Sequence, residues 1–170
     1  MTVRIHSFPP IESSRARVLI LGTMPGKASL AAQQYYAHPR NAFWHILGSL
    51  LGFDPAAPYA LRTRSLSAAA IAVWDVLHSC ERTSSLDSDI AEEIPNDFAT
   101  FFAAHSRITT VFFNGGNAAR LYARHVRPLL GGLPPLEEVR LPSTSPAHAG
   151  LRLDAKLRAW GVVVEKLRAP

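Results

Sequence analysis

The chain has 170 residues, enough to bury one sizeable core, and we expect a single domain over residues 1–170. Its 48% apolar and 18% charged residues exclude an intrinsically disordered protein, and its single cysteine excludes an internal disulfide framework and a Cys-ligated zinc or iron–sulfur centre. The formal net charge of +5, with 15 Arg against 3 Lys, favours a polyanionic partner, although a solvated surface or the codon usage of an Arg-rich genome would give the same balance.

Short apolar runs, each leading into a loop, predict buried strands. In chain order they cover Arg17–Gly22, Ala70–Trp74 and Thr109–Asn114, and a weaker fourth run covers Glu138–Leu141. The apolar spacing predicts helices over Asn41–Leu51, Asn96–Ala104, Asn117–Val126 and Leu153–Leu167. We expect Asn117 to cap the third of these helices, because Asn is a favoured N-cap.

Strands that alternate with helices indicate βαβ units. We therefore predict an α/β fold, a three-layer sandwich with a central, mainly parallel four-stranded sheet that helices cover on both faces. In such folds ligands bind beyond the carboxyl ends of the strands. The loops expected at that edge are Thr23–Arg40, Asp75–Leu86, Asn114–Asn117 and Pro142–Gly150.

The loop after the first strand begins Gly22-Thr23-Met24-Pro25-Gly26. Glycine lets a backbone approach a ligand closely and proline stiffens the turn, so Thr23 and Met24 are candidates to contact a bound ligand, although the same pattern also fits a plain turn. The loop is not a dinucleotide-binding fingerprint, because GxGxxG is absent, and it is not a Walker loop.

Several motifs follow one another along the chain: GTMPG at 22–26, YAHPRNAFW at 36–44, WDVL at 74–77 with SLD at 85–87, and LPSTSPAH at 141–148. Together they resemble the uracil-DNA glycosylase superfamily, most closely its hypoxanthine-DNA glycosylase branch. The resemblance implies a uracil-DNA glycosylase-like fold. It also implies an enzyme that flips a deaminated base out of DNA and hydrolyses its N-glycosidic bond without a cofactor.

The resemblance assigns the catalytic role to Asn41. The mismatch-specific branch has an asparagine in its first motif, at the place of Met24, and methionine cannot position a water. The hypoxanthine branch instead uses the asparagine of H-P-x-N-x-F-W, which is Asn41 here. An amide can hold a water through its carbonyl and donate through its NH₂ without changing charge. Asn41 could equally be a helix N-cap, and both roles are open.

By the same resemblance, Tyr36 stacks on the flipped base. Thr23 and Met24 are expected to bind the base as well, since backbone N–H groups of their loop could bond to its edge. A stacked aromatic returns ~1–3 kcal/mol to an extruded base. The alternative for Tyr36 is a core residue with a satisfied hydroxyl. Tyr35 is expected to be structural, and Phe43 and Trp44 are expected in the core.

The last motif would form the DNA-binding loop. In the superfamily a Ser- and Pro-rich loop here presses into the minor groove and fills the hole that the flipped nucleotide leaves. Small hydroxyls reach phosphates and prolines keep a wedge rigid, although the segment alone is only a loop. His148 would contact phosphate, support developing charge, or lie on the surface. The residues are Ser143, Thr144 and Ser145 as phosphate or sugar contacts, Pro146 and Ala147 as the wedge, and His148.

Two further features follow strands. Asn114 stands at the end of the third strand, where its amide could read the base edge or form a turn or cap. Asp75, Arg82 and Asp87 could shape the pocket floor or form a structural salt-bridge cluster.

We therefore predict a DNA-deoxyinosine glycosylase of base excision repair that removes hypoxanthine and leaves an abasic site. The expected partner is DNA with a deaminated base, with no metal and no cofactor. Met1–Phe8 carries no apolar signal and no run reaches the ~20 apolar residues of a membrane span, so we expect a cytoplasmic monomer without membrane contact. The alternatives are a uracil or G:T/G:U mismatch-specific DNA glycosylase, a DNA-binding module without catalysis, and an α/β interaction domain.

Overall fold

The structure is a computed structural model that describes residues 3–170. Its main sheet has four strands in the order β3-β2-β6-β7, and all neighbouring pairs are parallel. The strands are β2 (Val18–Gly22), β3 (Ile71–Asp75), β6 (Thr110–Asn114) and β7 (Glu137–Leu141). Each lies within one residue of its predicted bounds, so the predicted parallel sheet is confirmed.

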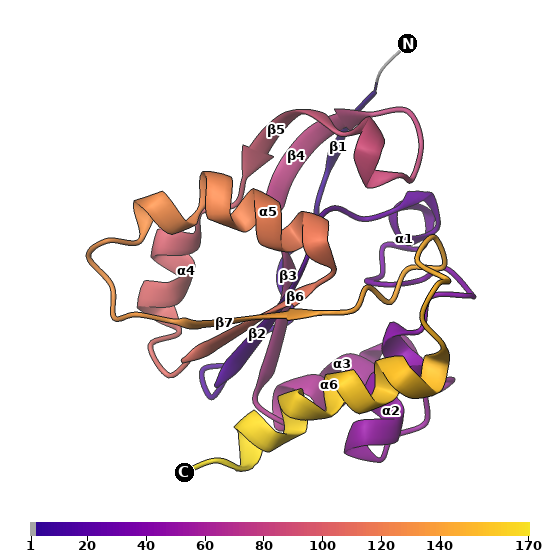
Figure 1. Cartoon of the computed structure of the whole chain (residues 1–170), viewed down its shortest axis with the longest axis vertical. Helices are drawn as coiled ribbons and strands as arrows, with labels where there is room; N and C mark the ends of the chain where they lie inside the picture. The colour runs from indigo at the N-terminus through magenta and orange to yellow at the C-terminus, as the bar shows by residue number, and fades with distance from the viewer. Residues whose placement is uncertain (1–2) are drawn as a thin grey trace.

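Helices cover both faces of this sheet, as Figure 1 shows. One face carries α2 (Phe43–Leu51), α3 (Tyr59–Ala68) and α6 (Leu153–Arg168), and the other carries α4 (Phe98–Ala104) and α5 (Gly116–His125). Side chains of a strand point alternately to opposite faces. In β2, Val18 and Ile20 accordingly pack into the α2/α3/α6 core, whereas Leu19 and Leu21 pack into the α4/α5 core. The three-layer sandwich is confirmed.

A second, three-stranded sheet was not predicted. It has the order β1-β4-β5, and β4 (Leu77–Arg82) runs antiparallel to both β1 (Val3–His6) and β5 (Ala91–Pro95). The expectation of a loop over residues 75–86 was therefore wrong. Polar residues are frequent in these strands, and β4 pairs with β5 through two register shifts, so neither strand shows a clean alternation.

The order of the main sheet creates a crevice. The chain leaves β2 for the edge strand β3 and then returns to β6 on the other side of β2, so the connections after β2 and β6 diverge. Ligands of open α/β sheets bind outside the carboxyl ends of strands at such a switch point. The residues at those ends are Gly22, Asp75 and Asn114.

Helix starts differ from expectation near this edge. α2 begins at Phe43 rather than Asn41, and α5 begins at Gly116 with Gly115 as its N-cap, so Asn117 lies inside the first turn and does not cap the helix. Gly115 has φ +96°, and an added methyl group would lie 3.0 Å from Ser143 Cβ, so this position requires glycine.

Three short helices complete the fold: α1 (Lys27–Ala32), inside the expected loop 23–40, and the 3₁₀ turns η1 (Asp87–Asp89) and η2 (Arg127–Leu129). Neither α1 nor α3 was predicted. In α3 only Leu66 is fully buried, so the helix lacks a continuous apolar face. Within residues 3–170, no helix combines the length and apolarity that a membrane crossing requires.

Candidate active site

A cavity of about 350 Å³ lies at the carboxyl ends of β2, β3 and β6. Its walls come from the loop 22–26, the segment 35–41, the η1 region and the segment between β7 and α6. The structure brings together all the residues that the sequence singled out for catalysis, base binding or DNA contact. These residues are Thr23, Met24, Tyr36, Asn41, Asn114, Ser143, Thr144, Ser145, Pro146, Ala147 and His148.

Hydrogen bonds from β4 and from Val76, which precedes it, hold the loop 22–26 in place. Gly22 O accepts from Val76 N at 2.9 Å, and the buried Arg82 guanidinium donates to Pro25 O. Thr23 and Met24 are only 7% and 8% exposed, and Met24 packs into the α4/α5 core. The position of Met24 therefore presents no hydrogen-bonding group other than its backbone.

Asn41 stands at the cavity wall immediately before α2. Its Oδ1 accepts from Phe43 N at 2.9 Å, so the side chain satisfies a donor at the start of the helix. Its Nδ2 makes no hydrogen bond to any described residue. The amide therefore keeps two N–H donors and one acceptor lone pair for a water or a ligand.

The two adjacent tyrosines have different surroundings. Tyr35 is 4% exposed and its hydroxyl donates to Pro9 O at 2.9 Å, in agreement with the structural role expected for it. Tyr36 has φ +55°, and its ring stacks on Phe43 with centroids 4.0 Å apart. Phe43 thus backs one face of the Tyr36 ring, which also lines the cavity.

The Tyr36 hydroxyl is buried and has no hydrogen-bond partner of normal geometry within the described chain. Burial raises the pKa of this hydroxyl far above its ordinary value, and the nearby charge of Asp75 raises it further, while the Asn114 amide opposes the shift. Tyr36 therefore stays protonated at neutral pH.

Thr144 joins three segments of the chain. Its backbone N–H donates to Asn114 Oδ1 at 2.9 Å, and its Oγ1 accepts from Asn114 Nδ2 at 2.9 Å. Its carbonyl accepts from Ala42 N at 3.0 Å, next to Asn41. Because a backbone N–H can only donate, the Asn114 oxygen must face it, and this fixes the orientation of the amide.

These contacts change the expectation for two residues. Thr144 is 1% exposed, so its hydroxyl is turned inward to Asn114 and not toward the phosphate or sugar contact expected from the sequence. Asn114 uses its oxygen and one N–H on Thr144, and a single amide proton is left for other partners.

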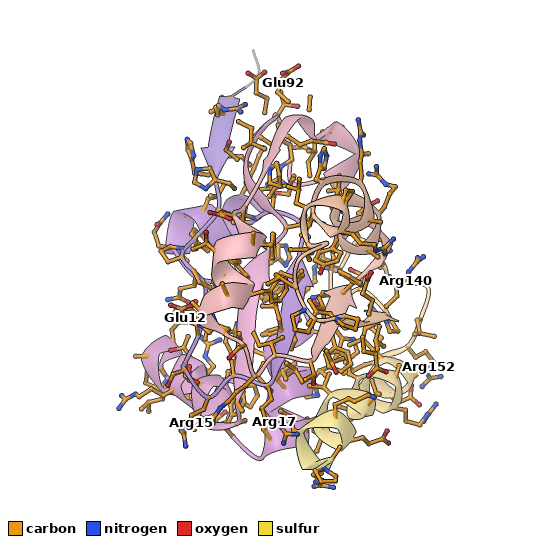
Figure 2. All side chains as sticks on the ribbon, turned by 90° about the vertical axis from the view of Figure 1, so that its left-hand side faces the viewer. Glu12, Arg15, Arg17, Glu92, Arg140 and Arg152 are labelled. Carbon is orange, nitrogen blue, oxygen red and sulfur yellow. The ribbon has the colours of Figure 1, made fainter. Side chains whose placement is uncertain are left out.

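Helix α6 holds both ends of the segment 142–148. Trp160 Nε1 donates to Pro142 O at 2.9 Å, and Lys156 Nζ donates to His148 O at 2.8 Å. Inside the segment, the hydroxyls of Ser143 and Ser145 accept backbone N–H groups at 3.2 Å. Its outer end, Ala147 and His148, is exposed. Figure 2 shows Arg140 and Arg152, which flank the segment in sequence, on the same side of the molecule.

Asp75 is a candidate that the sequence offered only as part of a polar network. Its side chain lines the cavity, is 3% exposed, and receives no hydrogen bond from the described chain. Burial raises its pKa to about 7, and the negative charge of Asp87 adds to the shift, which Arg82 opposes. Asp75 therefore changes charge near neutral pH.

The network expected from Asp75, Arg82 and Asp87 forms only in part. Arg82 and Asp87 approach to 4.0 Å as a loose ion pair, and no ion pair to Asp75 is present among residues 3–170. The same residues contain no group of three His, Cys, Asp or Glu side chains placed to hold a metal ion.

Comparison with known proteins identifies the relatives of this chain. Residues 9–164 match the family model "Uracil DNA glycosylase superfamily". A hypoxanthine DNA glycosylase of Methanosarcina barkeri is 37% identical over 65% of this chain and 70% of its own length, and one of Methanosarcina acetivorans is 33% identical over 84% and 87%. A solution NMR structure from M. acetivorans, of a protein proposed to be a uracil DNA glycosylase, superposes with TM-score 0.83 at 30% identity, covering 98% of this chain and all of the other.

Thr144→Val should destabilise the fold by roughly 1–3 kcal/mol, because the isosteric side chain leaves the Asn114 amide N–H buried without its acceptor. Urea unfolding measures the change. The control is Thr63→Val on α3, where the hydroxyl bonds only an exposed carbonyl of its own helix and a change below about 0.5 kcal/mol is expected. Equal effects of the two substitutions would show that the hydrogen bond from Asn114 to the Thr144 hydroxyl contributes nothing to the fold.

Asp75→Asn should stabilise the fold at alkaline pH. Between pH 3.8 and about 7 the unfolded chain has already lost the proton that folded Asp75 still holds, so wild-type stability falls as pH rises through this window. The variant lacks this loss and should gain roughly 2–4 kcal/mol over wild type between pH 4 and pH 8. Thermal unfolding at several pH values measures it. If the stability advantage of Asp75→Asn over wild type shrinks as pH rises, Asp75 is ionised and paired in the fold.

Proposed function

Because this chain belongs to the uracil DNA glycosylase superfamily, we propose that the base it removes from DNA is hypoxanthine. The coarser activity is that of the family: the chain is a DNA glycosylase, a hydrolase of N-glycosyl bonds. Two relatives at 33–37% identity are named hypoxanthine DNA glycosylases, which supports the choice of base.

One observation in the structure carries the proposal. Met24 occupies the place of the first-motif amide with a buried apolar side chain, whereas Asn41 lines the same cavity with an uncommitted NH₂ group. An enzyme that lacks the first amide needs another group to position water. Asn41 is the residue placed for it.

In the reaction, the oxygen of a water molecule bonds to C1′ of deoxyinosine while the C1′–N9 bond breaks. The bond's electron pair leaves with the base, which takes up one proton. The water keeps one hydrogen as the hydroxyl of the abasic sugar and releases the other as a proton, so the step balances. Asn41 orients the water against an oxocarbenium-like sugar, and Tyr36 stacks on the flipped base with Phe43 behind it. The last free proton of the Asn114 amide and the backbone of the loop 22–26 contact the base edge.

The segment 142–148 serves as the DNA-contacting loop. Its clamps to α6, Asn114 and Ala42 make it stiff enough to occupy the space of a flipped nucleotide. Ser143, Ser145, Pro146, Ala147 and His148 line the cavity and remain the residues for DNA contact, whereas Thr144 fastens the loop. The enzyme works on DNA as a monomer, and the formal charge of +5 favours that polyanionic partner.

Asn41→Ala should lower single-turnover release of hypoxanthine by about 100-fold or more, because the water loses its oriented partner. Release is measured from labelled duplexes that carry one hypoxanthine, one uracil or one mismatched thymine. Asn41→Ser is the matched variant, since serine restores an acceptor for the start of α2 but not the amide. It should recover stability and leave release slow.

Three outcomes oppose the proposal. Hypoxanthine release at the wild-type rate in Asn41→Ala would remove Asn41 from catalysis. Full activity in Asn41→Ser would reduce Asn41 to a helix cap. Release of uracil alone by the wild-type protein would move the substrate to the uracil or mismatch class.

A further inference from the structure

The carboxyl group of Asp75 is the feature of the cavity that the proposed reaction leaves unused. It stands at the end of β3, with its backbone carbonyl bonded to Asn96 Nδ2 at 2.8 Å and its side chain at the cavity. Its Oδ2 is buried without a partner, and no described residue bonds to the rest of the carboxyl group. A buried polar group with no partner costs stability, so its retention points to a ligand that completes it.

The geometry around Gly22 places this carboxyl group beside Tyr36, the residue proposed to stack on the base. A methyl group built on Gly22 would lie 2.7 Å from Asp75 Oδ1 and 2.8 Å from the Tyr36 hydroxyl. Both oxygens therefore converge over the same backbone position, on the cavity side of the loop 22–26. The Asp75 carboxyl therefore lies beside the hydroxyl end of the Tyr36 ring, in the cavity that would hold a base stacked on Tyr36.

We propose, on the basis of the function proposed above, that Asp75 acts in its carboxylic-acid form as the hydrogen-bond donor and general acid for the leaving base. The C1′–N9 bond breaks with its electron pair on the base, and the proton of Asp75 passes to an acceptor atom of the base. For hypoxanthine the acceptors on one edge are O6 and N7. The proton that the attacking water releases then restores the acid through solvent.

The neutral form is the one that fits the chemistry. The base becomes negative as the glycosidic bond breaks, so an ionised carboxylate beside it would oppose the reaction and a neutral donor favours it. The groups facing Asp75 are Tyr35 and Tyr36, which stay protonated, Asp87 from η1, and Arg82 from β4. Burial and Asp87 favour the neutral acid, while Arg82 keeps ionisation near neutral pH.

Bound substrate strengthens the preference of Asp75 for its neutral form. A bound base displaces solvent from the cavity, and DNA phosphates add negative charge, and both effects favour the neutral acid. A carboxylic acid that an apolar site keeps protonated is an effective donor to a developing anion. Asp75 therefore belongs among the residues that touch the reacting base.

The test is the pH profile of single-turnover base release by wild type, Asp75→Asn and the control Asp154→Asn, between pH 5.5 and 9. Asp154 lies on the exposed surface of α6 and gives the same Asp-to-Asn exchange away from the cavity. Wild type and Asp154→Asn should lose rate above a midpoint at or above about pH 7, since bound DNA favours the neutral acid, by about tenfold for each further pH unit. Asp75→Asn keeps a donor but has no proton to give, so its rate should be roughly 100-fold lower at pH 6 and independent of pH.

A wild-type profile that is flat or rises with pH, or the same decline in Asp75→Asn, would overturn the acid role of Asp75. Hypoxanthine and uracil duplexes are run in parallel. If only uracil is released, the substrate proposal fails while the pH profile on uracil still decides the role of Asp75. If no base is released from either duplex, both proposals fall together.

Discussion

The site depends on the two-point pairing of Asn114 with Thr144. These residues end β6 and follow β7, and the carbonyl of Thr144 extends the contact to Ala42 at the start of α2. Three segments from distant parts of the chain are thereby fixed to one edge of the sheet. The position of Asn41 relative to the segment 142–148 follows from this junction, and so does the shape of the cavity between them.

The cavity floor is built at a cost to stability. Within residues 3–170, Asp75 Oδ2, the Tyr36 hydroxyl and two nitrogens of the Arg82 guanidinium are buried without a hydrogen-bond partner. A fold selected for stability alone would replace such groups with apolar side chains of similar volume. Their concentration around the loop 22–26 instead marks a place where buried polar groups lack hydrogen bonds, which is typical of functional sites. The buried polar groups without partners, which lower stability, are thus evidence that the chemistry takes place at this loop.

The strands and the sandwich could be predicted because three of the four strands of the main sheet are short apolar runs, and alternation with helices has few topological solutions. Strand β4 could not be predicted, because its buried positions include Ser79, Cys80 and Arg82 and its pairing with β5 is irregular. The motifs predicted residues that lie together, since those expected to act in catalysis, base binding and DNA contact all line one cavity. Local sequence could not reveal that Thr144 turns inward or that Asp75 lacks a partner, because both depend on contacts between residues that are far apart in the chain.

The central claim is that this cavity receives a base flipped out of DNA. The most direct measurement is a crystal structure of the Asn41→Ala variant bound to a duplex with one deoxyinosine. We predict that hypoxanthine lies in the cavity against Tyr36, with an acceptor atom of its edge within hydrogen-bond distance of the Asp75 carboxyl. A base that remains stacked in the duplex, with the protein bound through a different face, would contradict the account.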